Sequence, residues 1–197
     1  VVLSKQIHED VVRHVTEDDA GKGLWRERDY PSVDGMVTDV PHLPLVVFSA
    51  DCNVVLLYDP VRGAIGACHA GWRGTALGIA GKTVREMVRL FGCRPSDIRA
   101  AIGPAIGQCC FETDGDVPEA LHAALGAEAD PYITWNGRKY HIDLKAINAL
   151  WLRKAGVAAV DISGDCTACR TDLYWSHRKH GGARGSQIAM ISLEDTL

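Results

Sequence analysis

Two histidines and one cysteine are the side chains of this sequence best suited to metal chemistry. His8, Cys52 and His69 offer two imidazole nitrogens and one thiolate, which are common zinc ligands in proteins. Three protein ligands with an open fourth position are typical of catalytic rather than structural zinc. By spacing alone, three unrelated side chains are the simpler interpretation, so the surrounding sequence has to decide.

His69 lies in a segment that gathers several reactive side chains. The run Cys68-His69-Ala70-Gly71-Trp72-Arg73-Gly74 follows an apolar stretch and precedes an amphipathic one, which predicts a strand, a turn and then a helix. Gly71 and Gly74 let the backbone approach a ligand closely. The planar guanidinium of Arg73 is suited to phosphate or carboxylate. The alternatives are a tight turn with a half-buried tryptophan, and a salt bridge from Arg73 that locks that turn.

Cys52 is predicted to meet His69 at one end of a β-sheet. An apolar run from Pro44 to Phe48 ends at Ser49-Ala50-Asp51-Cys52, and a second run follows before the turn that leads back to His69. A thiol and an imidazole on successive strands can therefore approach each other. Asp51 is a candidate to orient His8 or His69 through a hydrogen bond. Capping a turn is its alternative role.

Five segments, taken in order along the chain, carry a family resemblance. They are Gln6-Ile7-His8, Asp34-Gly35 with Thr38, Ala50-Asp51-Cys52 with His69 to Gly74, Ile102 to Gly107 with Cys109 to Glu112, and Ser176-His177-Arg178 with Arg184-Gly185. Together they resemble the laccase-domain family, also called the polyphenol oxidase or YfiH-like family. Ordered motifs over most of a chain are far more specific than one short motif.

Members of that family are mostly described as zinc-dependent purine nucleoside phosphorylases. The resemblance implies zinc as the cofactor and site residues of two kinds. The catalytic metal ligands are His8, Cys52 and His69, and the substrate-binding residues are Arg73, Asp51 and Arg178. It also implies phosphate and a purine nucleoside as substrates, with adenosine, inosine, guanosine and methylthioadenosine as candidates. An accompanying adenosine deaminase activity would make the chain a transferase and a hydrolase.

Three other functions stay open. The first is a copper-dependent polyphenol oxidase, which gave the family its older name, although coupled reduction of dioxygen needs more histidines than the few that cluster here. The second is a metal-binding protein without turnover. The third is a cysteine hydrolase with Cys52 as nucleophile and His69 as base, which is excluded if the thiolate is a metal ligand.

The sequence departs from the family pattern in a few places. Glu9 stands where the family has glycine, Trp175 where it commonly has phenylalanine, and Ser186 where it has arginine. Relatives also carry a longer segment before the first motif. We therefore expect residues 1–197 to form a single laccase-domain-like domain that is incomplete at its N-terminus relative to the family.

Composition excludes several classes of protein. The 197 residues are 47% hydrophobic and 23% charged, as in ordinary globular proteins. A net charge of −4 gives no basic footprint for nucleic acid or anionic membranes, although the cluster of Arg178, Lys179 and Arg184 could bind one phosphate. No apolar run approaches the ~20 residues of a membrane span. Seven cysteines cannot all pair internally, so a reducing cytoplasm is expected, with a monomer or weak homo-oligomer.

Hydrophobic patterning predicts a single α/β (mixed α+β) domain with a mixed, largely buried β-sheet flanked by helices. Strands are expected at Val1 to Val15 with His8 near the middle, at Pro44 to Cys68, Ile98 to Ile102, Val157 to Ile162 and Gln187 to Leu193. Helices are expected at Thr75 to Phe91, from Asp116 to about Leu125, and after a capping Asp143. Asn136-Gly137 predicts a hairpin. A long loop rich in Cys, Arg and His precedes the last strand.

That loop contains the pair Cys166-x-x-Cys169, a second candidate for metal or redox chemistry. A structural zinc site usually needs a second spaced pair, and Cys109 and Cys110 are adjacent rather than spaced. A thioredoxin-like role needs the pair at a helix N-terminus, whereas this one lies in a polar loop. Neither role is predicted here, and the contribution of the four cysteines stays open.

Overall fold

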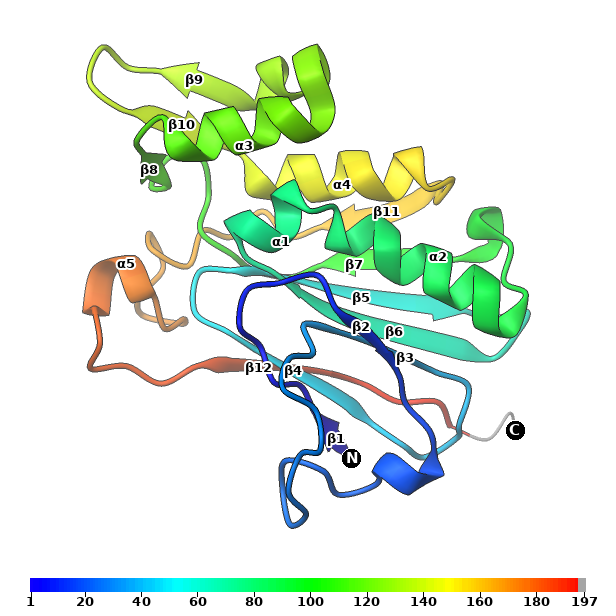
Figure 1. Ribbon diagram of the computed structural model, residues 1–197. Helices are drawn as coiled ribbons and strands as arrows, with labels where there is room; N and C mark the ends of the chain where they lie inside the picture. The colour runs from blue at the N-terminus through cyan, green and yellow to red at the C-terminus, as the bar shows by residue number, and fades with distance from the viewer. Residues whose placement is uncertain (195–197) are drawn as a thin grey trace.

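The computed structural model describes residues 1–194, in which six strands precede the first α-helix and helices and strands are interspersed thereafter (Figure 1). The strands are β1 (Val2–Leu3), β2 (Val12–His14), β3 (Gly35–Thr38), β4 (Leu45–Ser49), β5 (Asn53–Asp59), β6 (Ala64–Ala70), β7 (Arg99–Ile102), β8 (Glu112–Thr113), β9 (Ile133–Trp135), β10 (Tyr140–Ile142), β11 (Ala159–Ile162) and β12 (Gln187–Ile191). The α-helices are α1 (Trp72–Ala76), α2 (Ile79–Phe91), α3 (Asp116–Leu125), α4 (Leu144–Lys154) and α5 (His177–His180). Short 3-10 helices lie at Glu17–Asp19, Pro95–Asp97 and Gly126–Tyr132.

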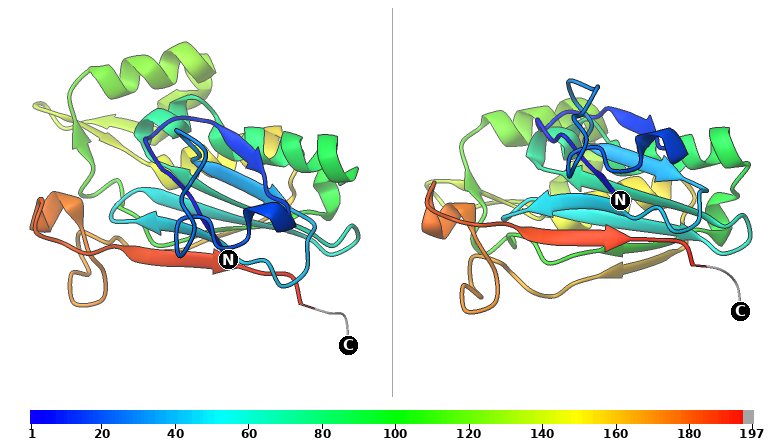
Figure 2. Two further views of the ribbon diagram at one scale, coloured as in Figure 1. Left: turned by 60° about the horizontal axis from the view of Figure 1, so that its bottom comes forward. Right: turned by 90° about the horizontal axis from the view of Figure 1, so that it is seen from below.

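A six-stranded mixed sheet, with the order β11-β7-β5-β6-β3-β2, forms the middle layer. Its central strand β5 pairs antiparallel with β6 and β7, whereas β7–β11 and β2–β3 are parallel pairs. Helices α2 and α4 cover one face, and a second sheet, β1-β4-β12, packs on the other (Figures 1 and 2). The small sheet β8-β10-β9 lies with α3 at one end of the molecule (Figure 1).

The central strands are buried on both faces. Val55 and Leu57 of β5 pack in the cluster on the helical side with Met87, whereas Val54 packs between the two sheets with Ile65. Continuous apolar runs are typical of strands covered on both sides, since neither face meets water. The predicted mixed α/β fold is therefore confirmed.

The segment predicted as one helix, Thr75 to Phe91, is two helices. Gly78 adopts a left-handed φ of 72° and separates α1 from α2. Leu77, in the break between the two helices, is 48% exposed, whereas one continuous amphipathic helix would turn it toward the core. A Cβ added at Gly78 would lie 3.3 Å from the ring of Trp151. The glycine therefore permits close packing of this turn on α4.

The strand predicted from Val1 to Val15 is interrupted around His8. β1 joins the second sheet and β2 joins the six-stranded sheet, so the chain crosses between layers in the intervening residues. His8 adopts a left-handed φ of 67° in this crossing. A side chain remote in sequence, Asp34, holds the bend, and no local pattern in the N-terminal segment announces it.

Local signals elsewhere are confirmed. Asn136-Gly137 joins β9 and β10 as an antiparallel hairpin. The carboxylate of Asp143 accepts a hydrogen bond from the backbone N–H of Ala146 at 3.0 Å and caps α4. Gly92, with a φ of 66°, ends α2. None of the helices within residues 1–194 has the length and apolarity that crossing a bilayer requires.

Candidate metal centre and active-site pocket

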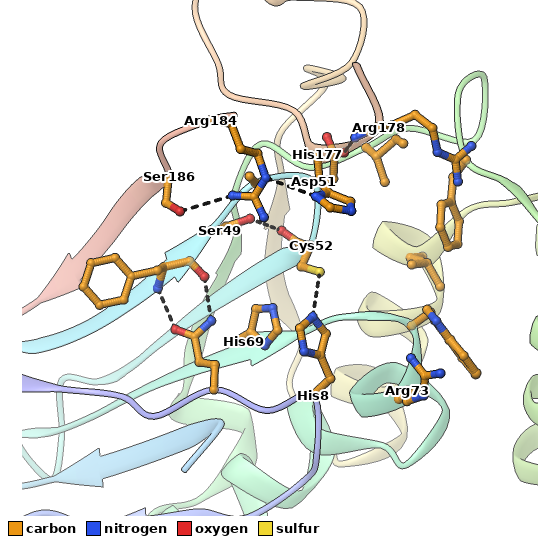
Figure 3. A pocket seen from close by; sticks show the side chains of 17 residues that line it. His8, Ser49, Asp51, Cys52, His69, Arg73, His177, Arg178, Arg184 and Ser186 are labelled. Carbon is orange, nitrogen blue, oxygen red and sulfur yellow. Dashed lines mark hydrogen bonds between the residues drawn. The ribbon is translucent and has the colours of Figure 1, made fainter. Parts of the chain in front are cut away.

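His8, Cys52 and His69 converge at one end of the six-stranded sheet (Figure 3). His69 belongs to β6, opposite Val54 in the antiparallel pair with β5, and Cys52 immediately precedes β5. One ligand atom from each of the three side chains lies within 4.8 Å of the others. The Cys52 Sγ and His8 Nε2 atoms are 3.9 Å apart. The approach of thiol and imidazole expected from successive strands is therefore present.

A buried carboxylate orients both histidines. Asp34 is fully buried and lies 2.9 Å from Nδ1 of His69 through its Oδ1 atom. The same carboxylate accepts hydrogen bonds from the backbone N–H groups of Ile7, His8 and Glu9, each at 3.1 Å. These bonds fix the strained backbone of His8 and leave Nε2 of His69 to face Cys52. The sequence analysis used Asp34 only as part of an ordered motif, although a carboxylate at the start of a buried strand needs a partner.

Gly71 allows the three ligands to approach one another. A Cβ at this position would lie 2.9 Å from Cδ2 of His8 and 3.1 Å from Sγ of Cys52. Its φ of −63° is ordinary, so the requirement is for space and not for a special backbone conformation. A side chain at Gly71 would push two of the ligands apart.

The three side chains form a strongly polarised group. Burial raises the pKa of the Cys52 thiol, but hydrogen bonds and charge from His69 and His8 outweigh burial and lower this pKa to about 6. Burial lowers the pKa of His69, but Asp34 and Cys52 reverse that effect and raise it to about 9. Thiolate is the form of cysteine that binds metal. The environment of Cys52 therefore favours the ligand state of its sulfur.

Asp51 holds the long C-terminal loop. Its carboxylate accepts hydrogen bonds from the hydroxyls of Thr167 and Ser176, at 2.6 and 3.0 Å, and from the backbone N–H of Arg178 at 2.7 Å. Asp34, and not Asp51, is the carboxylate bound to His69. Of the two roles considered for Asp51 beyond substrate binding, the structure shows the cap. It adopts a left-handed φ of 85°, a strained conformation typical of functional sites.

The three ligands line a cavity of about 380 Å³, within the usual size of small-molecule sites. Trp72, Phe111 and Phe48 supply aromatic surface, and the other lining residues include three arginines, Arg73, Arg178 and Arg184. The guanidinium of Arg73 lies 4.2 Å from the centre of the Trp72 ring. Within residues 1–194 it has no carboxylate partner, so the salt bridge considered as its alternative role is absent from the described part of the chain.

The other two arginines differ in how they are held. Arg178 donates from its guanidinium to the backbone oxygens of Cys110 and Glu112, at 3.0 and 2.9 Å, and so joins two walls of the cavity. Arg184 donates from Nε to Nδ1 of His177 at 3.2 Å and from Nη1 to the backbone oxygen of Gly185 at 3.0 Å. Arg178 therefore has a structural task, whereas Arg184 keeps guanidinium N–H groups available at the cavity.

A second group of candidate ligand side chains lies outside the residues that line the cavity. The sulfur atoms of Cys109, Cys110, Cys166 and Cys169 all lie within 4.8 Å of one another. Sequence spacing argued against a joint site because Cys109 and Cys110 are adjacent, and the structure overturns that argument. The sequence feature that could have indicated this group is that two cysteines follow each of two predicted strands, Ile98 to Ile102 and Val157 to Ile162.

The donor set of His8, Cys52 and His69 fits a metal ion. In a tetrahedral zinc site with bonds of roughly 2.0–2.3 Å, neighbouring ligand atoms are separated by less than about 4 Å. The observed 3.9 Å between sulfur and nitrogen needs only a small contraction. With an ion bound, three protein ligands would leave one coordination position open, as is typical of catalytic zinc, and the three side chains line the cavity.

Comparisons with known proteins identify relatives over nearly the whole chain. The purine nucleoside phosphorylase YlmD of Geobacillus stearothermophilus is 39% identical over 201 aligned residues, covering 96% of this chain and 71% of the relative. The enzyme of the same name from Bacillus subtilis is 35% identical and covers 98% and 71%. The human purine nucleoside phosphorylase LACC1 is 33% identical, covering 87% of this chain and 41% of its own length.

Solved structures agree with this relationship. The Bacillus licheniformis hypothetical protein YfiH matches with a TM-score of 0.91 and 38% identity, covering 98% of this chain and 74% of that one. YlmD from Geobacillus stearothermophilus matches with the same TM-score and 36% identity, covering 98% and 73%. The model of the family described as multi-copper polyphenol oxidoreductase laccase matches residues 1–194. By sequence, by fold and by its ordered motifs, this chain belongs to that family.

Proposed function

We propose that this protein is a zinc-dependent purine nucleoside phosphorylase with an accompanying adenosine deaminase activity. The observation that carries the proposal is the open set of three ligands, His8, Cys52 and His69, in the wall of a cavity large enough for a nucleoside. Similarity to relatives that are named purine nucleoside phosphorylases supports it. The proposed cofactor is zinc rather than copper, since the ligand set is a single mixed sulfur and nitrogen group.

Each part of the cavity has a task in this proposal. His8, Cys52 and His69 hold the ion, which when bound supplies Lewis acidity and lowers the pKa of water toward about 7. Asp34 keeps His69 in the orientation that presents Nε2. Aromatic rings such as Trp72 can stack on the purine, a contact worth roughly 1–3 kcal/mol per base.

Phosphate is assigned to the arginines with free donors. Arg73 has no carboxylate partner among the described residues, and Arg184 keeps part of its guanidinium free, so both can bind an anion. In phosphorolysis a phosphate oxygen attacks C1′ of the ribose, the bond from C1′ to the purine nitrogen breaks, and its electron pair leaves with the base. Asp51 and Arg178 contribute to substrate binding in this proposal chiefly by fixing the wall against which the substrate lies.

Deamination uses the same cavity. Water adds to C6 of adenosine, and ammonia leaves from the resulting tetrahedral carbon. Nucleoside choice among adenosine, inosine, guanosine and methylthioadenosine is then decided by contacts at C2 and C6 of the purine and at the 5′ position of the ribose. The all-cysteine composition of the second ligand group does not favour the alternative of a multi-copper oxidase, because copper oxidase chemistry relies on imidazole ligands.

The experiment is incubation of the purified protein with each nucleoside, with and without phosphate, followed by chromatographic identification of products. We expect free base and ribose 1-phosphate only when phosphate is present, and inosine and hypoxanthine from adenosine. The metal of the active preparation should be zinc. A preparation that oxidises phenols with copper but leaves all four nucleosides intact contradicts the proposal. If neither nucleosides nor phenols react, the result contradicts the proposal in favour of a metal-binding protein without catalysis.

We also propose a cytoplasmic location and a monomer or weak homo-oligomer. All seven cysteines are free thiols, which suits a reducing compartment. Fractionation of cells and sedimentation of the purified protein test these two statements.

A further inference from the structure

Four of the seven cysteines form a compact cluster outside the cavity. Sγ of Cys109 lies 3.8 Å from that of Cys110 and 3.7 Å from that of Cys169, and Cys110 and Cys169 are 3.4 Å apart. Sγ of Cys166 lies within 4.8 Å of the other three. No part of the proposed purine chemistry uses these thiols.

The fold brings the two cysteine pairs together through strand pairing. β7 and β11 are adjacent parallel strands, so the loops that leave their carboxyl ends run side by side. An isolated parallel bridge between Ala105 and Cys166 extends this pairing, and the N–H of Thr167 donates to the oxygen of Ala105 at 3.1 Å. Each loop then forms a turn. The backbone N–H of Cys110 donates to the backbone oxygen of Gly107 at 3.0 Å, and the backbone N–H of Cys169 donates to the backbone oxygen of Cys166 at 3.1 Å. The turns point the sulfurs of both loops toward one position.

The sulfur separations match one tetrahedral ion. Four sulfurs bound to zinc at about 2.3 Å lie roughly 3.8 Å from one another. A disulfide would bring two of them to about 2.05 Å, and all seven cysteines are free. An iron–sulfur cluster spreads its cysteine sulfurs over several iron atoms, which a spread of 4.8 Å at most does not accommodate. A single thiophilic ion therefore fits the cluster better than either alternative.

One sulfur also has a contact typical of a thiolate ligand. The backbone N–H of Gly107 donates to Sγ of Cys166 at 3.1 Å in a buried position. Such a bond stabilises a negatively charged sulfur, which is the form of cysteine that binds metal. Cys109 and Cys169 are exposed, so an ion can reach the cluster from solvent.

We propose that Cys109, Cys110, Cys166 and Cys169 bind one zinc ion in a closed four-sulfur site that fastens the C-terminal loop to the wall of the cavity. The neighbours of the ligands carry the effect to the cavity. Thr167, next to Cys166, donates to Asp51, and Arg178 donates to the backbone oxygen of Cys110. The ion would thus fix the two loops, around Cys110 and around Thr167, to which Asp51 and Arg178 are bonded.

The test measures the metal content of the Cys52→Ala protein. This substitution removes one of the three proposed ligands of the site formed by His8, Cys52 and His69, so that the metal measured belongs to the cluster. Protein purified under reducing conditions without chelator should hold about one zinc per chain by elemental analysis, in a tetrahedral thiolate site. Replacement by cobalt should give the strong thiolate-to-cobalt absorption of a four-sulfur site. Adding Cys109→Ser and Cys169→Ser, the two exposed ligands, should abolish both signals. The matched control is Cys93→Ser, a buried cysteine beside Asp59 and outside the cluster.

A second readout covers the case in which the double substitution destabilises the protein. In the Cys52→Ala protein, chelator treatment should increase amide hydrogen exchange in residues 105–112 and 164–180 without unfolding β5 and β6. The proposal is overturned if the Cys52→Ala protein contains no metal and takes up no cobalt, if the double variant keeps its metal, or if the four thiols are disulfides under reducing conditions. None of these results depends on purine turnover, so this proposal and the proposed enzyme can fail separately.

Discussion

The group of His8, Cys52 and His69, here called the histidine centre, and the four-cysteine cluster are linked by one hydrogen bond between residues next to them, yet they differ in construction. Cys52 follows Asp51 and Cys166 precedes Thr167, and the Thr167 hydroxyl donates to the Asp51 carboxylate at 2.6 Å. The histidine centre has three ligands, two donor types and a cavity at its open position. The cluster has four ligands of one type.

Their supports differ as well. The histidine centre rests on β6, on the start of β5 and on a buried carboxylate that fixes two of its ligands. The cluster rests on two loops held by turns and one bridge. A rigid frame with one free coordination position suits chemistry, whereas four sulfurs that close around an ion suit the fixing of loops. The comparison indicates that the support of a ligand group, and not only its donor atoms, decides which purpose the group suits.

The strongest test of this contrast is Cys52→Ala. We expect the histidine centre to lose its zinc and both purine activities to fall to background, because two ligands do not hold the ion. The cluster should keep its metal. In the unmodified protein, alkylation of Cys52 should be slow until a chelator removes the ion, since the lone pair of the thiolate is engaged. Rapid labelling of Cys52 in zinc-loaded, active protein would instead support a cysteine nucleophile.

Gly71→Ala tests whether space alone holds the histidine centre together. The new Cβ would lie 2.9 Å from His8 and 3.1 Å from Cys52, so the ligands must separate. We expect activity to fall about a hundredfold, as displacements near 1 Å commonly cause. Gly164→Ala is the matched control, because a Cβ there meets nothing within 4 Å. Equal activity of the two variants would contradict the assigned role of Gly71.

Asp34→Asn should weaken one centre and spare the other. The neutral amide no longer stabilises the charge and orientation of His69, and loss of such a partner typically lowers metal affinity about 10–100-fold. Affinity at the cluster should stay within error of the unmodified protein. Competition with a fluorescent chelator measures both sites, with Cys52→Ala isolating the second. An equal loss of metal affinity at the histidine centre and at the cluster would mean that Asp34 acts through the stability of the whole fold.

Acid should distinguish the thiols once the metal is removed. The pKa of Cys52 is about 6, so its thiolate persists above that pH, and its alkylation rate should fall about tenfold per pH unit below it. Burial and contacts with the neighbouring thiols raise the pKa values of Cys109 and Cys110, so their labelling should increase only at alkaline pH. Mass spectrometry of chelator-treated protein across pH measures each site. Coincident profiles for the three thiols would contradict the expectation.

Arg73→Lys has the smallest expected effect. Lysine keeps the charge but loses the planar fork, so we expect activity to fall about tenfold if the guanidinium binds phosphate, the value of one charge-assisted hydrogen bond. The free energy of unfolding should change by less than about 0.5 kcal/mol, as at other exposed positions. Arg153→Lys, on the exposed side of α4, is the control. A fall in melting temperature without loss of activity would assign Arg73 to the turn.

Much of the fold could be predicted because its signals are local. The apolar runs of β4, β5 and β6, the Asn136-Gly137 hairpin and the Asp143 cap each depend on residues close in the sequence. Two predictions failed where a distant partner decides. Gly78 breaks the helix as Trp151 of α4 packs against it, and His8 leaves the strand because Asp34 binds its backbone. Neither Trp151 nor Asp34 is near the segment that it reshapes.

The two centres divide in the same way. The ordered motifs, through the family resemblance, predicted His8, Cys52 and His69 as one site, which spacing and residue types alone did not, and the structure brings the three together. The tertiary structure alone decided that Asp34 orients His69 and that Asp51 holds the C-terminal loop. It also decided the cluster: Cys109 and Cys169 are 60 positions apart, and only the parallel pairing of β7 with β11 carries their loops to one place. Strand pairing over such distances depends on the whole sheet, and no spacing within either loop encodes it.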